Sequence, residues 1–218
     1  GSSQRIEVVM IGVSTGGPQA LATLLPQLPA HFPVPIVLVQ HMPPIFTKLL
    51  AERLAGQCAI QVNEGVTGGE LKAGSAWIAP GDYHMLLERQ GTAVRLRLQQ
   101  EPPENSCRPA VDVLFRSAAK VYGAQTLAVV LTGMGQDGLR GCEAIKKVGG
   151  QVVVQDEASS VVWGMPGFVA RAGLADAVLP LNRLAAEIIQ RVERGRSTST
   201  GQRETAVKSQ TGQVQRGT

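Results

Sequence analysis

Three polar side chains follow three apolar segments of this sequence, and together they could perform nucleophilic catalysis. A serine hydroxyl becomes a useful nucleophile only when a nearby base takes its proton, and histidine titrates in the right range to do so. A carboxylate bonded to that histidine fixes its tautomer and stabilises the imidazolium. The candidates are Ser14, His41 and Asp137, which come after the mainly apolar segments 6–11, 36–40 and 127–131. Their types predict a serine hydrolase triad.

The residues around Ser14 form a glycine-rich turn, Gly12-Val13-Ser14-Thr15-Gly16-Gly17-Pro18. A strand that ends in such a turn before a helix leaves a hydroxyl at the sheet edge, beside unpaired backbone N–H groups. Because negative charge is stabilised near a helix N-terminus, we predict the Thr15 N–H as the first oxyanion donor. The second is the N–H of Met134, which lies in the glycine-rich loop that carries Asp137.

Several alternatives stay open from these residues alone. The turn at 12–17 could bind a nucleotide phosphate, although GxxxGG departs from GxGxxG and no Lys-Ser/Thr follows it. His41 could be a packing histidine, and His84 could serve as the base instead. Asp156 competes with Asp137 for the carboxylate position. We favour Asp137 because its loop also offers backbone donors.

Other polar residues receive weaker assignments. Arg108, in a polar loop, and Met165, in Gly164-Met165-Pro166, are predicted to contact substrate. Asp112 is interpreted as a carboxylate in the first turn of a helix. Three cysteines at positions 58, 107 and 142 are widely spaced and include no CxxC, which argues against a disulfide framework and a zinc site. Acyl transfer by a serine, a histidine and an aspartate needs neither a metal nor an organic cofactor, so we expect none.

Short apolar runs alternate with amphipathic segments, which predicts an α/β fold with a doubly wound, mainly parallel sheet and helices on both faces. Loops at the carboxyl ends of the strands would then share one edge, where sites form. An antiparallel hairpin is predicted at 85–88 and 93–98, around Gln90-Gly91. The expected strands are 7–11, 36–40, 59–62, 76–79, 127–131 and 152–154, and the expected helices are 18–28, 46–54, 109–121, 138–148, 166–172 and 184–194.

Composition limits the class of protein. The 218 residues are 44% hydrophobic and 17% charged, which is typical of a globular chain. The net charge of +4 lies in residues 183–218, which hold seven Lys or Arg and three Glu, so the remainder is neutral and we expect no nucleic-acid partner. The sequence contains neither an apolar run of about 20 residues nor a signal peptide, which predicts a cytoplasmic protein without membrane insertion.

The domain limits follow from composition as well. Residues 1–4 are interpreted as a remnant of an expression vector, and 5–194 as one catalytic domain. From residue 195 to 218 the chain is rich in Ser, Thr, Gln, Gly and Arg. Such a segment buries too little apolar surface to offset its ordering entropy, so we expect it to be disordered.

Five motifs in order give the chain a specific resemblance. Over residues 5–194 the sequence resembles the catalytic domain of the bacterial chemotaxis methylesterase CheB. The motifs are Ile11-Gly12-Val13-Ser14-Thr15-Gly16-Gly17-Pro18, Gln40-His41-Met42-Pro43-Pro44, Arg108-Pro109-Ala110-Val111-Asp112-Val113-Leu114-Phe115, Leu131-Thr132-Gly133-Met134-Gly135-Gln136-Asp137-Gly138, and Gln155-Asp156-Glu157 with Gly164-Met165-Pro166.

The resemblance implies hydrolysis of glutamate γ-methyl esters on the cytoplasmic helices of chemoreceptors, and deamidation of receptor glutamines. It implies Ser14 as nucleophile, His41 as base and Asp137 as carboxylate, with the amides of Thr15 and Met134 as oxyanion donors. Full-length members carry a phosphoacceptor receiver domain, for which this chain has no room. The alternatives are an isolated effector domain, a stand-alone esterase and a non-catalytic receptor-docking domain.

Overall fold

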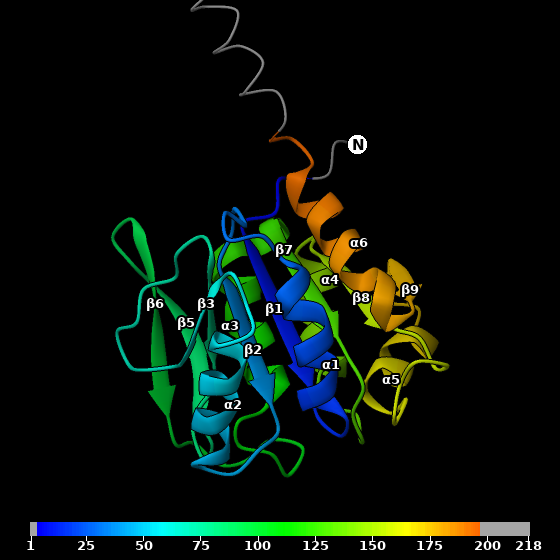
Figure 1. Ribbon diagram of the computed structural model, residues 1–218, viewed down its shortest axis with the longest axis horizontal. Helices are drawn as coiled ribbons and strands as arrows, with labels where there is room; N and C mark the ends of the chain where they lie inside the picture. Colours follow the sequence, from blue (N-terminus) through cyan, green and yellow to red (C-terminus); the bar gives the residue numbers. More distant parts are fainter. Residues whose placement is uncertain (1–3, 197–218) are drawn as a thin grey trace, which may run out of the picture.

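The computed structural model describes residues 4–196, which form a single parallel sheet between two layers of helices (Figure 1). The seven strands are ordered β3–β4–β2–β1–β7–β8–β9, and every neighbouring pair is parallel. The predicted α/β fold is therefore confirmed. The strands are β1 (Val8–Val13), β2 (Ile36–Gln40), β3 (Gln61–Glu64), β4 (Ser75–Ile78), β7 (Thr126–Val130), β8 (Gln151–Gln155) and β9 (Ala177–Leu179).

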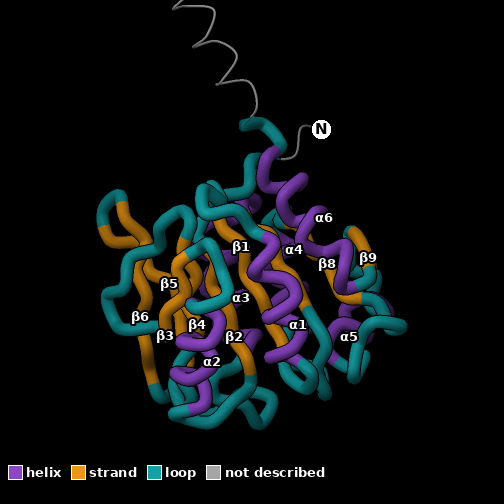
Figure 2. Tube along the Cα trace, viewed as in Figure 1, coloured by secondary structure: helices purple, strands orange, loops and turns teal. Residues whose placement is uncertain are grey.

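Helices cover both faces of the sheet, as predicted (Figure 2). On one face α1, α2 and α6 pack against the strands, and on the other face lie α3, α4 and α5. In the described part of the chain, no helix is both long and apolar enough to cross a membrane. The helices are α1 (Gly17–Leu24), α2 (Phe46–Ala55), α3 (Val111–Tyr122), α4 (Leu139–Lys147), α5 (Met165–Arg171) and α6 (Leu181–Glu193).

The central strand β1 shows why this sequence forms a doubly covered sheet. All six of its residues are buried. Side chains alternate between the faces of a strand, so Val9 and Ile11 enter one core while Val8 and Met10 enter the other. A strand buried on both faces is a continuous apolar run, which is the pattern that the sequence has here.

An antiparallel hairpin, β5 (His84–Gln90) and β6 (Ala93–Gln99), lies outside the main sheet and agrees with the predicted one. Its apolar side chains, including Met85 and Leu96, join the same core as α3. The hairpin thus extends the layer that holds α3 against the sheet.

The sequence prediction missed some elements. The short strand β9 was not predicted, and α6 begins at Leu181, three positions before the expected start. The predicted tail lies outside the described residues from 197 onward, as do residues 1–3 of the predicted N-terminal remnant. Neither of these two predictions is tested.

The sheet has a topological switch point at β1, because β2 to β4 lie on one side of it and β7 to β9 on the other. After β1 the chain continues into α1 on one face, whereas after β7 it continues into α4 on the other. The loops after β1 and β7 therefore start side by side at the carboxyl edge and lead to opposite faces of the sheet. Ligand sites of open α/β sheets occur at such switch points.

Candidate active site at the carboxyl edge of the sheet

Ser14 and His41 are neighbours because their strands are paired in register. Val13 pairs with Gln40 at the ends of β1 and β2. The His41 N–H donates a hydrogen bond to the Val13 carbonyl at 3.2 Å. The residues that follow, Ser14 and His41, therefore leave the same edge of the sheet next to each other.

Gln40 fixes this arrangement, although the sequence analysis gave it no role. Its side chain is 2% exposed, and its Nε2 donates to the carbonyl of Ser14 at 3.0 Å and to that of His41 at 3.2 Å. One buried amide thus holds both backbone segments. The signal that could have indicated it is a polar residue at the end of an otherwise apolar strand, directly before His41.

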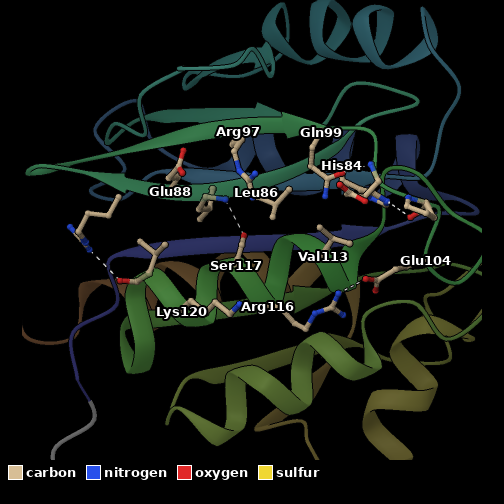
Figure 3. Close-up of a pocket in the computed structure, with 15 residues that line it drawn as sticks. His84, Leu86, Glu88, Arg97, Gln99, Glu104, Val113, Arg116, Ser117 and Lys120 are labelled. Atoms are coloured by element: carbon tan, nitrogen blue, oxygen red, sulfur yellow. Dashed lines mark hydrogen bonds and ion pairs between the residues drawn. The ribbon is translucent and has the colours of Figure 1, made fainter.

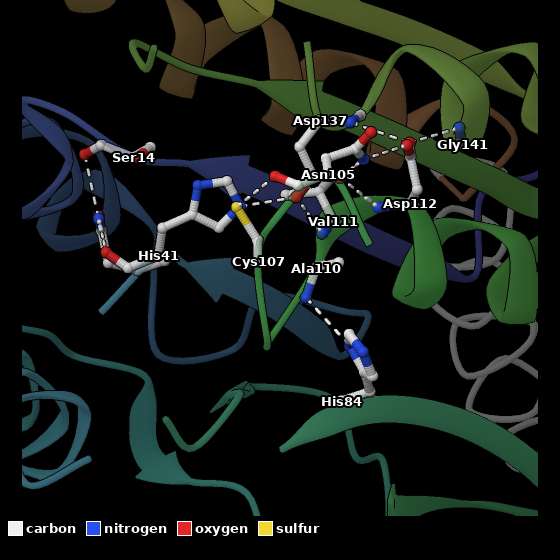
Figure 4. Close-up of polar contacts among 12 residues, drawn as sticks. Ser14, His41, His84, Asn105, Cys107, Ala110, Val111, Asp112, Asp137 and Gly141 are labelled. Atoms are coloured by element: carbon white, nitrogen blue, oxygen red, sulfur yellow. Dashed lines mark hydrogen bonds and ion pairs between the residues drawn. The ribbon is translucent and has the colours of Figure 1, made fainter. Parts of the chain in front are cut away.

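Asp137 reaches His41 from the loop after β7. The His41 Nε2 lies 2.6 Å from the Asp137 Oδ2, and Figure 4 shows the His41 ring between Ser14 and Asp137. The histidine side chain is 14% exposed and the aspartate side chain 2% exposed. A carboxylate and an imidazole are thus in direct contact at the sheet edge, with little water around the carboxylate.

Four N–H groups surround the Asp137 carboxylate. The His41 Nε2 and the Val111 amide point to Oδ2, while the Asp112 amide and the Asn105 Nδ2 donate to Oδ1. Burial pushes the pKa of Asp137 up, but the hydrogen bond and charge of His41 and the two α3 amides lower it overall. The carboxylate therefore stays ionised at the N-terminus of α3, where negative charge is favoured.

The contact with Asp137 also determines the pKa and the tautomer of His41. Burial lowers the pKa of the imidazole, but the hydrogen bond and charge of Asp137, with a further contribution from Cys107, raise it overall above 6.5. In the neutral ring, the proton shared with Asp137 is on Nε2, so the lone pair on Nδ1 remains to accept a proton. The base form grows as pH rises, so a reaction that uses His41 as base accelerates from neutral toward alkaline pH.

No hydrogen bond joins the Ser14 hydroxyl to His41, or to any other residue between 4 and 196. Catalytic hydrogen bonds are often long in structures without substrate and shorten when substrate binds. The structure thus places Ser14 next to His41, but the hydrogen bond between the Ser14 hydroxyl and the His41 ring that the predicted triad requires is not formed.

The two predicted oxyanion donors lie in turns that are tied together. The Ser14 N–H donates to the Thr132 carbonyl at 2.9 Å, and the Thr132 Oγ1 donates to the Thr15 carbonyl at 2.8 Å. Within residues 4–196, the N–H groups of Thr15 and Met134 donate no hydrogen bond. Both amides are therefore available to an anion.

Glycine is required where these two turns meet. A Cβ on Gly133 would lie 2.9 Å from the Ser14 Cβ and 2.4 Å from the Met165 Sδ, distances at which something must shift. Gly16 has φ +82°, a conformation that favours glycine. The glycine-rich loops thus serve close packing around Ser14.

The alternative base and carboxylate are engaged elsewhere. His84 is 1% exposed; its Nδ1 accepts from the Ala110 N–H at 3.2 Å, so its Nε2 is the donor to the Pro102 carbonyl at 3.0 Å. Asp156 Oδ1 accepts from the N–H and the hydroxyl of Ser159 in its own loop. Of the two candidate carboxylates, Asp137 is the one that contacts His41.

The predicted substrate-contact residues differ in their surroundings. Arg108 lines a cavity of about 310 Å³ that also contains His41 and Cys107, but its guanidinium is bonded to Asp82 at 2.6 Å. Met165 is fully buried, and its backbone N–H donates to the Gly133 carbonyl. Met165 therefore presents no exposed atoms to a substrate here, and a packing role under the loop suits it better.

The larger cavity, of about 510 Å³, lies between the hairpin and α3 (Figure 3). It is lined by acidic and basic residues, among them Glu88, Arg97 and Lys120. None of Ser14, His41 and Asp137 lines it. The candidate catalytic residues therefore lie outside this cavity.

A metal ion would fit poorly among the candidate ligands. The donor atoms of His41, Cys107 and Asp137 lie within 4.8 Å of one another. However, the 2.6 Å between the histidine and aspartate atoms is shorter than the roughly 3.3 Å that separates tetrahedral zinc ligands. A metal would have to break the His41–Asp137 hydrogen bond.

Comparisons with known proteins place the chain in a family. A protein-glutamate methylesterase/protein-glutamine glutaminase from Trichodesmium erythraeum is 65% identical over 188 residues, which cover 86% of this chain and 53% of the relative. A protein with the same description from Nocardioides sp. is 53% identical over 189 residues, 87% of this chain and 51% of the relative. The chain thus spans about half the length of these curated relatives.

A solved structure and a family model agree with these matches. The crystal structure of the Thermotoga maritima CheB methylesterase catalytic domain matches with a TM-score of 0.84 and 45% identity, covering 86% of this chain and 99% of that one. The CheB methylesterase family model matches residues 9–188. The chain belongs to the CheB methylesterase family.

Proposed function

We propose that this chain hydrolyses γ-methyl esters of glutamate side chains, releasing methanol and a protein carboxylate. The observation that carries the proposal is the 2.6 Å contact between His41 and Asp137 beside Ser14, in a chain of this family. The relatives' name also includes glutaminase, so we extend the proposal to glutamine side chains, where ammonia leaves instead of methanol.

Ser14 is the nucleophile in the proposed mechanism. Its Oγ attacks the ester carbonyl carbon while the His41 Nδ1 takes the hydroxyl proton. The carbonyl oxygen becomes an oxyanion that accepts hydrogen bonds from the amides of Thr15 and Met134. Asp137 holds the ring and stabilises the imidazolium.

Collapse of this intermediate completes the cycle. The carbonyl re-forms, the carbon–oxygen bond to the methoxy group breaks, and His41 gives its proton to the departing methanol. A water molecule then attacks the acyl-enzyme, again with His41 as base, and releases the glutamate carboxylate and free Ser14. Every proton that moves passes through one imidazole.

The surface around Ser14 favours a macromolecular substrate. Several apolar side chains at this edge are unusually exposed, among them Ile45 at 71%, Met134 at 67% and Val161 at 69%. Contiguous exposed apolar surface commonly marks an interaction site. We propose the methylated cytoplasmic helices of chemoreceptors as substrate, and the cytoplasm as the place of action, in line with the family resemblance.

Methanol release from methylated receptor membranes tests the proposal. We expect the wild-type chain to release methanol at a rate proportional to protein concentration, and neither NAD nor ATP to raise its melting temperature. A chain that releases no methanol but is stabilised by a nucleotide would instead support the phosphate-binding interpretation of residues 12–17. A chain that binds receptor membranes without releasing methanol would be a docking domain.

A further inference from the structure

Asn105 joins two buried carboxylates beside His41. Its Nδ2 donates to the Asp137 Oδ1 at 3.0 Å and to the Asp112 Oδ2 at 2.9 Å (Figure 4). Asp112 is 1% exposed and Asp137 is 2% exposed. A side-chain amide has two N–H donors, so Asn105 uses one on each carboxylate.

A tight turn presents this amide. The chain reverses between Glu104 and Cys107, whose backbones exchange two hydrogen bonds of 3.1 and 2.8 Å. The central residues Asn105 and Ser106 have φ values of +51° and +60°. Asparagine tolerates this left-handed conformation better than most residues, so it suits both the turn and the two carboxylates.

Asp112 anchors the other side of the arrangement. Its Oδ1 accepts from the N–H groups of Gly138 at 2.9 Å and Gly141 at 2.7 Å, at the N-terminus of α4. Asp137, which precedes α4, in turn accepts from the first amides of α3, including that of Asp112. Asp137 thus caps α3, the helix that contains Asp112, while Asp112 caps α4, the helix that follows Asp137, and Asn105 bridges the two carboxylates.

The pKa values of the two carboxylates shift in opposite directions, and Asn105 opposes the rise at Asp112. Burial raises the pKa of Asp112, and the charge of Asp137 adds to the rise, while hydrogen bonds from Gly141 and Asn105 oppose it. The pKa of Asp137 is lowered instead. Without the amide between them, two carboxylates would face each other at low dielectric, where like charges repel strongly.

We propose that Asn105 and Asp112 are positioning residues that hold the Asp137 carboxylate in line with His41. The Asn105 amide adds a side-chain donor to Oδ1 beside the backbone N–H of Asp112, which favours the rotation of the Asp137 carboxylate in which Oδ2 meets the His41 Nε2. Neither residue needs to touch the substrate. The role of this pair in catalysis rests on the proposed function, whereas its effect on His41 does not.

NMR titration of the His41 imidazole in Asn105→Gly tests the inference. Glycine adopts a positive φ freely and Asn105 is exposed, so the variant is expected to fold. With one of the two donors to Oδ1 removed, the Asp137 carboxylate is held less firmly in line with His41, and the His41 pKa should fall by about one unit from its raised value in the wild type. Ser106→Gly, at the other positive-φ position of the turn, is the control and should leave that pKa unchanged.

Kinetics provide a second readout. On a small ester, kcat of Asn105→Gly should fall about 10- to 100-fold with KM nearly unchanged, as for other residues that orient a reacting group. Asp112→Asn should act in the same direction. The amino group of the new asparagine would face N–H donors on either side, because both oxygens of Asp112 now accept hydrogen bonds. Since both changes act through one carboxylate, the double variant should lose less than the product of the two single losses.

The outcomes separate this inference from the proposed function. An unchanged His41 pKa in folded Asn105→Gly would overturn the positioning role, whatever the enzyme does. A lowered pKa in a protein whose wild type hydrolyses no ester would support the positioning role and contradict the proposed function. A lowered pKa with a reduced kcat supports both.

Discussion

Ser14→Ala is expected to reduce methanol release from methylated receptors by about 10⁶-fold, as removal of the nucleophile does in other serine hydrolases. Without the hydroxyl no acyl-enzyme can form, and the oxyanion amides alone retain little of the rate enhancement. The hydroxyl makes no hydrogen bond within residues 4–196, so the melting temperature should stay that of the wild type.

The matched control for this variant is Ser160→Ala. Ser160 lies at the same edge of the sheet, in the loop after β8, where its hydroxyl donates to the Asp156 carbonyl. It should keep nearly full activity. A folded Ser14→Ala protein that retained a tenth of the wild-type rate would refute the assignment of the nucleophile.

Asp137→Asn is expected to lower kcat by about 10⁴-fold, as the equivalent change does in other triads. Asparagine keeps the shape but replaces one oxygen with an amino group. That group would meet two N–H donors where the carboxylate now accepts from His41 and Val111, or from Asp112 and Asn105. The tautomer and orientation of His41 would no longer be fixed, and its pKa would fall with the loss of the charge.

Asp156→Asn is the control for the choice between the two carboxylates. Asp156 follows β8 at the same edge but accepts from Ser159 within its own loop. Its loss should cost stability and leave kcat within a few-fold of the wild type. The opposite pattern, with Asp156→Asn inactive and Asp137→Asn active, would show that the wrong carboxylate was chosen.

The sequence could predict the backbone of this site because local rules fix it. Apolar runs ending at Ser14 and His41 become parallel strands, and parallel strands bring their carboxyl ends to one edge. The loop at Asp137 follows the same rule. These positions depend on strand order and register, which hydrophobic patterning largely determines.

The residues that support the site could not be predicted in this way. The contact of Asn105 with Asp137 spans 32 positions and depends on the conformation of a four-residue turn. Asp112 does lie in the first turn of α3, as interpreted, but its side chain caps α4 instead. Met165 is fully buried, and its burial depends on tertiary packing that no local sequence pattern reveals.

Covalent labelling with a fluorophosphonate, mapped by mass spectrometry, tests most directly whether Ser14 is activated by His41, and it requires no receptor. The folded wild-type chain should acquire one adduct, on Ser14, at a rate that rises with pH as His41 loses its proton and that collapses in His41→Ala. An unlabelled wild-type chain, an adduct on another serine, or undiminished labelling of His41→Ala would contradict the proposed triad.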